Sequence, residues 1–234
     1  MQDGEGREIN LHKSLTINNR NKLSKTIRAI RYDSCPLEVN LHIHSTFSDG
    51  SLSPTEIYNQ AKELDIKNFA ITDHHNINAF FEIEKHVIRD IKLLSINQPN
   101  FWTGIEITCL LKGCLVHVLG FGFDTKSPSL DKYITNQSAV GYNLLASTVV
   151  NCIHKANGIA ILAHPARYKI PFQTLINEAS SLKFDGVETW YDYERSATWQ
   201  PSKFVCESIF KQAKLLDLLS TCGTDTHGIS LIRR

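Results

Sequence analysis

The sequence has 234 residues, of which 42 % are hydrophobic and 21 % are charged, as in an ordinary soluble globular protein. The 25 Lys and Arg residues nearly balance the 24 Asp and Glu residues, which excludes a protein that coats nucleic acid through bulk charge. The composition also excludes intrinsic disorder, a collagen-like repeat and a disulfide miniprotein. No run approaches the ~20 apolar residues of a membrane span, and the first residues lack the apolar core of a secretory signal.

The six cysteines are scattered and form no C-x-x-C pair, which excludes zinc-finger and thioredoxin motifs. Reduced thiols and a cytoplasmic location are therefore expected. Residues 1–37 are predicted to be an N-terminal extension, and the main domain is expected over 38–234. Within the extension, Leu23, Ile27 and Ile30 fall at i, i+4 and i+7, which is enough for a short amphipathic helix that could dock on the main body.

From Glu38 onward, short apolar runs alternate with helical periodicity. Strands are predicted at Val39–His44, Phe69–Ile71, Phe101–Thr108, Leu115–Phe121, Ile159–Leu162, Gly186–Trp190 and Leu218–Cys222. Helices are predicted at Thr55–Leu64, Ala79–Leu94, Tyr142–Ala156, Phe172–Leu182 and Ser202–Lys214, the first of them after a Ser53–Glu56 capping box. This alternation favours a parallel α/β architecture, and the placement of polar residues favours a closed or distorted barrel.

Nearly every predicted strand ends in a side chain that can bind a metal ion. The set comprises His42, His44, Asp73, His74, Glu106, His117, His164, Asp225 and His227. Because the chemistry of barrels sits at the carboxyl ends of the strands, these side chains are expected to converge on one mouth. His42 and His44 are two residues apart on a strand and so point to one face, where both can chelate one ion. Asp49, in the turn that follows, can reach the same mouth.

Together these motifs resemble the PHP (polymerase and histidinol phosphatase) superfamily. The likeness covers nearly everything from Glu38 to Arg234 and rests on HIHSTFSDGSLSPTEIYNQAKELDIKNFAITDHH, WTGIEI, VHVLGF, LAHPARY and GTDTH. It is greatest for the stand-alone bacterial and cyanobacterial branch that contains 5′→3′ exonucleases and 3′,5′-nucleoside bisphosphate phosphatases. That branch carries a helical insertion before the A-H-P strand, for which this sequence has no room.

The resemblance implies a distorted (βα)7, TIM-like barrel that holds two to three divalent ions. The mixed nitrogen and oxygen ligands suit Mn, Fe or Zn. One ion would be held by His42, His44, Glu106 and Asp225, a second by Glu106, His117 and His164, and a third by Asp49, His74 and His227. Such ions would supply hydroxide for attack on phosphorus. His227 or Asp225 could protonate the leaving oxygen, and the sequence leaves the acid unassigned.

Other residues near the strand ends are expected to bind the substrate or to support the metal ligands. Arg167 is expected to bind phosphate through two hydrogen bonds, as part of the catalytic set with Asp225 and His227. Tyr168 and Glu188 are expected to contact the substrate, with support of a metal ligand as an equal alternative for Glu188. Asp73 is expected to orient His74 or a loop, and His75 to lie at the rim or to support the site. The aromatic residues Tyr168, Trp190, Tyr191 and Tyr193 could stack on a base.

The predicted function is hydrolysis of phosphomonoesters, or of 5′-end phosphodiesters, in nucleotides or short oligonucleotides. The partner is then a phosphorylated small molecule, a nucleotide or an oligonucleotide, without a membrane or an obligate protein partner. Three alternatives stay open: a histidinol-phosphate phosphatase, an amidohydrolase-like C–N hydrolase and a non-catalytic metal-binding regulatory module.

Overall fold

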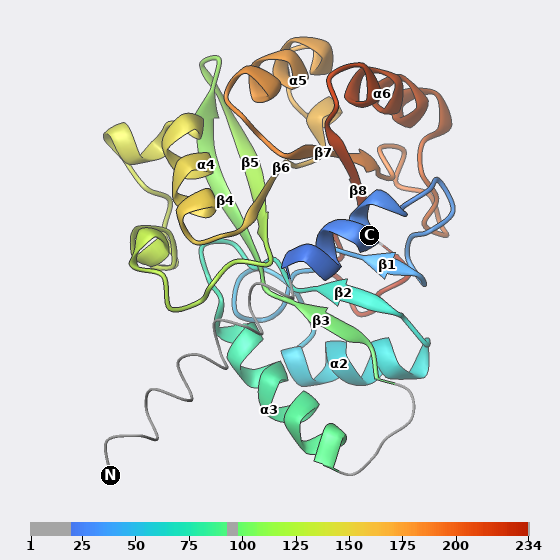
Figure 1. Ribbon diagram of the computed structural model, residues 1–234. Helices are drawn as coiled ribbons and strands as arrows, with labels where there is room; N and C mark the ends of the chain where they lie inside the picture. The colour runs from blue at the N-terminus through green and yellow to red at the C-terminus, as the bar shows by residue number, and fades with distance from the viewer. Residues whose placement is uncertain (1–19, 93–97, 234) are drawn as a thin grey trace.

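The computed structural model describes residues 20–92 and 98–233 and shows a mixed α/β chain (Figure 1). The strands are β1 (Val39–Asn40), β2 (Asn68–Ala70), β3 (Asn100–Trp102), β4 (Gly104–Leu111), β5 (Cys114–Phe121), β6 (Ile159–Leu162), β7 (Gly186–Trp190) and β8 (Leu219–Cys222). The α-helices are α2 (Pro54–Glu63), α3 (Asn78–Lys92), α4 (Ala146–Lys155), α5 (Phe172–Ser181) and α6 (Lys203–Leu215). Short 3₁₀ helices lie at η1 (Pro128–Tyr133), η2 (Gly141–Leu144) and η3 (Pro165–Arg167), and a further helix covers 20–28.

The strands form two sheets. One is parallel, with the order β1-β2-β3, and the other has the order β4-β5-β6-β7-β8. The single strand predicted over Phe101–Thr108 divides at Thr103, so that β3 and β4 enter different sheets. Gly104 allows the start of β4 to pass close to the segment after β2, because a Cβ at this position would lie 2.5 Å from the carbonyl oxygen of Ile71.

The expected parallel arrangement is wrong for part of the second sheet, where β5 is antiparallel to both β4 and β6. Lys112 and Gly113 connect β4 to β5 with φ values of 54° and 76°. Two successive residues with positive φ are typical of the two-residue turn that joins antiparallel strands. The other pairs of this sheet, β6 with β7 and β7 with β8, are parallel.

The two sheets do not close into a continuous barrel within the described residues. They meet instead at two seams, each made of an isolated bridge, Ile43 with Thr226 and His74 with Glu106. At the second seam, His75 N–H donates to the Glu106 carbonyl oxygen at 3.0 Å. Both seams therefore lie in the segments that carry the predicted metal ligands.

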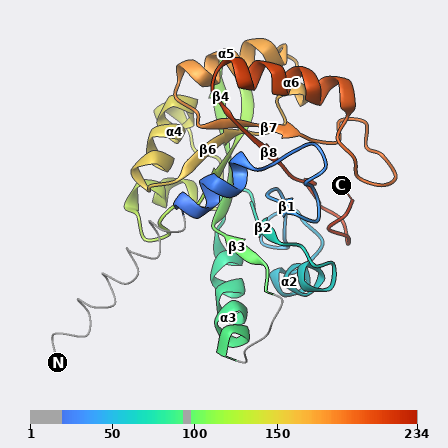
Figure 2. The same ribbon diagram turned by 45° about the vertical axis from the view of Figure 1, so that its right-hand side comes forward.

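Helices cover the outer faces of both sheets (Figures 1 and 2). α4, α5 and α6 lie along the five-stranded sheet, whereas α2 and α3 lie along the three-stranded one. The predicted capping box is confirmed, since Ser53 caps α2 and Glu56 reaches back to the Ser53 N–H at 2.8 Å. The predicted end of the second helix, Leu94, falls outside the described residues. Among residues 20–92 and 98–233, none of the helices combines the length and apolarity of a membrane span.

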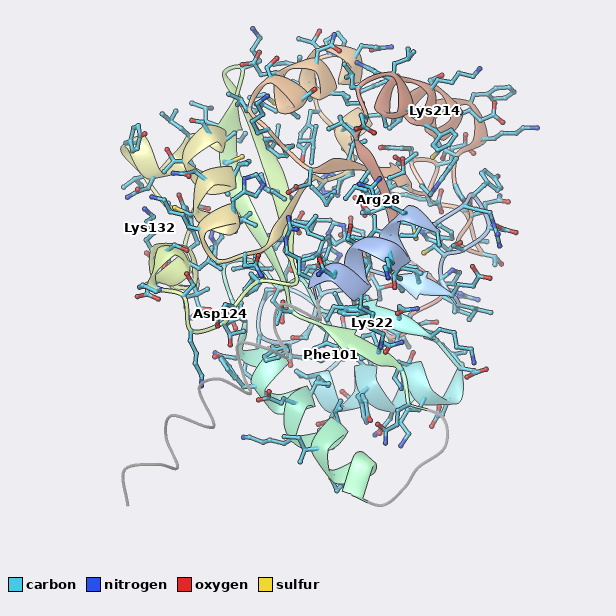
Figure 3. All side chains as sticks on the ribbon, viewed as in Figure 1. Lys22, Arg28, Phe101, Asp124, Lys132 and Lys214 are labelled. Atoms are coloured by element: carbon cyan, nitrogen blue, oxygen red, sulfur yellow. The ribbon has the colours of Figure 1, made fainter. Side chains whose placement is uncertain are left out.

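The helix over 20–28 packs into the core. Its Leu23 and Ile27 are fully buried, in a cluster that contains Val39 of β1 and Ile159 of β6. Lys22 of the same helix, labelled in Figure 3, lies near β3. Its ammonium group donates to Asn100 Oδ1 at 2.6 Å, at the start of that strand. Since β1 and β6 begin at this cluster, the helix covers the end of the strands opposite to the segments that carry His42 and His164.

Candidate metal centre

The segment after β1 carries two buried histidines, His42 and His44. Its backbone pairs with the chain beyond β8, because Asp225 N–H donates to the His42 carbonyl oxygen at 2.8 Å and His44 N–H donates to the Thr226 carbonyl oxygen at 3.0 Å. Gly223 makes this approach possible, since a Cβ there would lie 2.2 Å from the Cβ of His42. The first and last motifs of the sequence are thus in direct contact.

The central cluster consists of His42, His44, Glu106 and Asp225, all buried. Glu106 Oε2 lies 3.2 Å from His42 Nε2 and 3.1 Å from His44 Nε2, and Asp225 Oδ1 lies 3.2 and 3.3 Å from the same two atoms. Burial by itself lowers the pKa of His44, but the carboxylates of Asp225 and Glu106 outweigh it and raise that pKa to about 9. These four groups therefore place two imidazoles and two carboxylates around one point.

Glu106 also meets imidazoles on its other side. Its Oε1 lies 2.8 Å from His117 Nδ1 and 3.3 Å from His164 Nε2. Glu106 and His117 were expected at strand ends, but they lie within β4 and β5. They share a face because Thr108 pairs with His117 and Glu106 pairs with Leu119, so that side chains two residues apart on each strand point the same way.

An outer group surrounds Asp49, whose side chain is half-exposed. Asp49 Oδ2 lies 3.3 Å from His227 Nε2 and 3.7 Å from His74 Nε2, and its Oδ1 lies 3.4 Å from His44 Nδ1. Each of the nine predicted metal ligands thus belongs to at least one group whose ligand atoms lie within 4.8 Å of one another. His164 joins His42 and Glu188 in its group rather than His117.

The donor atoms of these groups suit a divalent ion. His44 Nε2, His117 Nδ1 and Glu106 Oε1 are buried, and although they lie within ion-pair distance of the cluster's other groups, none of them makes a hydrogen bond of acceptable geometry within the described residues. Burying an unpaired polar atom is costly, so three such atoms in one place indicate an additional partner. Imidazole nitrogen and carboxylate oxygen are the ligands that zinc, iron and manganese share. The residues present therefore fit bound divalent ions.

Glu188 supports the cluster from behind. It is fully buried, its Oε1 lies 2.9 Å from His42 Nδ1, and its Oε2 accepts a hydrogen bond from the His164 N–H at 2.9 Å. The expected contact between Glu188 and substrate is therefore corrected, because both of its oxygens are engaged away from solvent. A carboxylate on the far nitrogen of a ligating imidazole fixes the orientation of the ring.

Asp73 holds the turn that carries Asp49. It accepts hydrogen bonds from the Ser45 N–H at 2.7 Å and from the hydroxyl groups of Ser45 and Ser48 at 2.6 and 2.7 Å. His75 is buried rather than at the rim, and its Nε2 accepts a hydrogen bond from the Thr108 N–H at 3.2 Å. Burial lowers the pKa of His75, which favours the neutral ring that such acceptance requires.

The aromatic residues near the strand ends pack inward. Tyr191 is fully buried and donates to Asp225 Oδ2 at 2.6 Å, and Trp190 is also buried. Neither can act as the exposed stacking platform considered from the sequence. Tyr168 accepts a hydrogen bond from the His117 N–H at 2.8 Å. The sequence analysis missed the contact between Tyr191 and Asp225, because nothing in the pattern shows which way the residue after β7 turns.

Arg167 lies at the opening of the site. Its Nη1 donates to Asp225 Oδ2 at 2.9 Å and to the Tyr191 hydroxyl at 3.2 Å. A cavity of about 350 Å³ begins here and is lined by Arg167, Arg195, Ser196 and His227. Arg195 and Ser196 belong to no motif and were not predicted.

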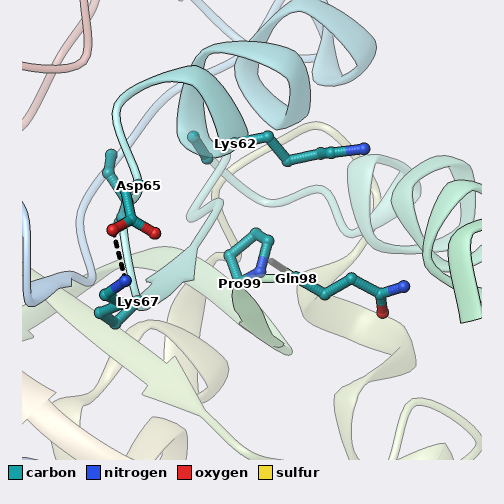
Figure 4. A pocket seen from close by; sticks show the side chains of 7 residues that line it. Lys62, Asp65, Lys67, Gln98 and Pro99 are labelled. Atoms are coloured by element: carbon teal, nitrogen blue, oxygen red, sulfur yellow. Dashed lines mark ion pairs between the residues drawn. The ribbon is translucent and has the colours of Figure 1, made fainter. Parts of the chain in front are cut away.

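A smaller hollow lies at the other end of β2 and β3 (Figure 4). It is lined by Lys62, Asp65, Lys67, Gln98 and Pro99, among others, and Lys67 forms an ion pair with Asp65. Lys67 precedes β2, whereas His74 follows it, so this hollow is separate from the histidine cluster.

The model of the PHP domain family matches residues 40–187. A 5′-3′ exoribonuclease of Haemophilus influenzae is 29 % identical over 156 residues, which cover 62 % of this chain. The matched region is about half of that relative, 54 % of its length. A 3′,5′-nucleoside bisphosphate phosphatase of Chromobacterium violaceum is 30 % identical over 92 residues, which cover 39 % of this chain and 30 % of that protein.

Solved structures share the fold. A proposed metal-dependent phosphoesterase of Bifidobacterium adolescentis has a TM-score of 0.65 at 18 % identity, over 85 % of this chain and 91 % of that one. An amidohydrolase of Chromobacterium violaceum with bound sulfate has a TM-score of 0.66 at 20 % identity, over 82 % and 88 % of the two chains. The family match contains all of the nine predicted metal ligands except Asp225 and His227, and it shows that this chain belongs to the PHP domain family.

Proposed function

We propose that the protein is a metal-dependent phosphoesterase that hydrolyses phosphomonoesters, or 5′-end phosphodiesters, of nucleotides or short oligonucleotides. The observation that carries this proposal is the convergence of imidazoles on both oxygens of the buried Glu106, with a guanidinium at the opening. The exoribonuclease and the bisphosphate phosphatase among the relatives support nucleotide substrates. We also infer that the two sheets, joined at their seams, are a distorted form of the predicted seven-stranded barrel.

The proposed ligand sets coincide with the groups described above for the first ion and overlap with them in part for the other two. His42, His44, Glu106 and Asp225 would hold one ion; Glu106, His117 and His164 a second; and Asp49, His74 and His227 a third. Divalent ions of the Mn, Fe or Zn type lower the pKa of bound water towards ~7 and neutralise charge on phosphate oxygens. Glu106 would contribute to both of the first two sites, because its two oxygens face different imidazoles.

The chain's own residues bind and orient the phosphate. The described side-chain contacts of Arg167 use Nη1 alone, so the remaining N–H groups of the guanidinium are available to phosphate oxygens. Asp225 and Tyr191 hold this guanidinium in place. His227 lines the cavity, whereas Asp225 is buried. In a state in which His227 holds no ion, it is the better placed of the two to give a proton to the leaving oxygen.

Phosphate release by metal-loaded protein tests the proposal. The substrates are nucleoside monophosphates, 3′,5′-bisphosphates, 5′-phosphorylated oligonucleotides and histidinol phosphate. Release is expected to disappear in a His42→Ala/His44→Ala variant and to persist in His86→Ala, which removes a histidine outside the site, beside Thr55. Absence of release from every substrate, with ions bound, would refute the phosphoesterase and favour the regulatory module.

The amidohydrolase alternative is tested separately, because one of the similar solved structures is described as an amidohydrolase. An amide substrate panel with the same variants decides it. C–N hydrolysis that depends on His42 and His44, without phosphate release, would replace the phosphoesterase. Preference for histidinol phosphate over all nucleotides would leave the reaction type intact and change the substrate.

A further inference from the structure

Asp225 uses its two carboxylate oxygens for different partners. Its Oδ1 faces the imidazoles of the central cluster, at 3.2 Å from His42 Nε2 and 3.3 Å from His44 Nε2. Its Oδ2 accepts hydrogen bonds from the Tyr191 hydroxyl at 2.6 Å and from Arg167 Nη1 at 2.9 Å. The groups that hold Oδ2 therefore determine that Oδ1 is the oxygen presented to the histidines.

Tyr191 is fixed on several sides. Its side chain is fully buried, and its ring packs against the rings of His164 and Tyr193, whose centroids lie 5.5 and 4.8 Å from its own. Its backbone is tied to the residue that precedes α6, because its carbonyl oxygen accepts a hydrogen bond from the Ser202 N–H at 3.1 Å. The phenol hydroxyl thus has little freedom to move away from Asp225.

Arg167 holds the same oxygen less firmly. Its side chain is 37 % exposed, so water and phosphate compete with Asp225 for its N–H groups. The Tyr191 hydroxyl accepts a hydrogen bond from Arg167 Nη1 at 3.2 Å and donates its own proton to Asp225, so that each donor in the set has an acceptor. Because a hydrogen bond to a charged acceptor is stronger when it is shielded from solvent, the phenol contributes more to the orientation of Asp225 than the guanidinium does.

We propose that Tyr191 is a positioning residue that holds Asp225 in the orientation in which it binds the ion of the central cluster, and that Arg167 is thereby left to the phosphate. The inference rests on the proposed function, in which Asp225 is a ligand of that ion and Arg167 binds the substrate. The two groups on Asp225 Oδ2 then have separate roles. Tyr191 sets the affinity for the ion, and Arg167 sets the affinity for the substrate.

Metal binding by Tyr191→Phe, which removes the hydroxyl and keeps the ring, tests this division. We expect its affinity for Zn²⁺, measured by competition with a fluorescent chelator, to fall ~10- to 100-fold, as is typical when a metal ligand loses its supporting partner. Arg167→Gln should bind Zn²⁺ as the wild type does. The matched control is Tyr133→Phe, which removes the hydroxyl of another buried tyrosine, one that donates to the Asn143 carbonyl oxygen at 2.9 Å. A loss of affinity in Arg167→Gln or in Tyr133→Phe as large as that in Tyr191→Phe would overturn the proposal.

Steady-state kinetics give a second measurement, with the nucleotide that the wild type hydrolyses fastest. In Tyr191→Phe, kcat should fall when the activating ion is limiting and should recover as its concentration is raised, with KM unchanged. In Arg167→Gln, KM should rise ~10- to 100-fold at every concentration of the ion, the loss typical of a charged hydrogen bond. A rise of KM in Tyr191→Phe that excess ion does not reverse would contradict the separate roles.

The outcomes separate this inference from the proposed function. If the wild type releases phosphate and Tyr191→Phe binds Zn²⁺ as tightly as the wild type does, the inference fails and the phosphoesterase stands. If the wild type releases phosphate from no substrate, the phosphoesterase fails, and the Zn²⁺ titrations alone decide the role of Tyr191. Circular dichroism of the metal-free variants checks the fold. A Tyr191→Phe variant that does not fold would assign the hydroxyl to the stability of the protein and refute the positioning role.

Discussion

Glu188 shows how much of this site depends on a side chain that cannot touch the substrate. Its two oxygens orient the His42 ring and hold the backbone of His164, which lie far apart in the sequence. The carboxylate sits between β7 and the segment after β1, entirely out of solvent. Glu188 alone therefore fixes the positions of two proposed metal ligands, His42 and His164.

Replacing Glu188 by Gln should weaken metal binding while preserving the fold. The amide keeps the shape but removes the negative charge behind His42, and loss of such a partner typically lowers metal affinity ~10- to 100-fold. Competition with a fluorescent chelator measures the affinity, and circular dichroism checks the fold. Glu56→Gln, on the exposed start of α2, is the control. An unchanged affinity in Glu188→Gln would contradict the orienting role.

The reactivity of the cysteines tests the burial of single residues. Burial raises the pKa of Cys206 to about 11, so its reactive thiolate is scarce at neutral pH. Five of the six cysteines are buried, and Cys114, at the start of β5, is the exception. Iodoacetamide at pH 8 should therefore label Cys114 first, as read by peptide mass spectrometry. Cys114→Ser should abolish the rapid phase, and rapid labelling of Cys206 in folded protein would contradict its burial.

The residues of the site divide by how far the sequence could predict them. His42, His44 and Asp225 stand in short motifs whose spacing reports a shared face, and the structure brings them together. Glu188 and Tyr191 were placed near the site, but their contacts depend on which way a side chain turns within a packed core. Arg195 has no motif around it, and only the folded loop places it at the cavity.

At the scale of helices and strands, the predictions that are confirmed are those for which the local sequence carries a clear signal. The strand bounds Ile159–Leu162 and Gly186–Trp190 agree with β6 and β7. The start of α2 was predicted within one residue, because Ser53 and Glu56 report the cap directly. The antiparallel β5 was missed, since strand direction follows from the turn at Lys112 and Gly113, which carries no strong hairpin signature.

The cap of α2 is worth a measurable part of the stability. Ser53→Ala removes the side-chain acceptor for the Glu56 N–H and should lower the free energy of unfolding by about 1 kcal/mol. Urea denaturation monitored by tryptophan fluorescence gives this value. Ser53→Asp, which retains an acceptor, should lie close to the wild type. Equal losses in the two variants would show that the capping oxygen is not the cause.

For the whole molecule, the helix over 20–28 is part of the core rather than an appendage. Leu23 and Ile27 contribute to a cluster with residues of both sheets. Leu23→Ala leaves a cavity in that cluster and should cost about 2–5 kcal/mol. Urea denaturation measures the loss, with the exposed Lys25→Ala as control. A loss below that of the control would show that the helix is dispensable to the predicted domain over 38–234.

The position of the metal centre at the seams between the two sheets has a consequence for the stability of the fold. Backbone ladders hold each sheet, whereas isolated bridges join the two sheets at the seams, and the ligand groups lie across both seams. An ion shared by His42 and Asp225 would close a loop that contains most of the chain, and it would act as a reversible cross-link. Such a link restricts the unfolded chain more as the loop grows. Chelation should therefore lower the melting temperature and speed amide hydrogen exchange at Ile43 and Glu106 more than within β5, so that one set of side chains both binds the ions and fastens the fold.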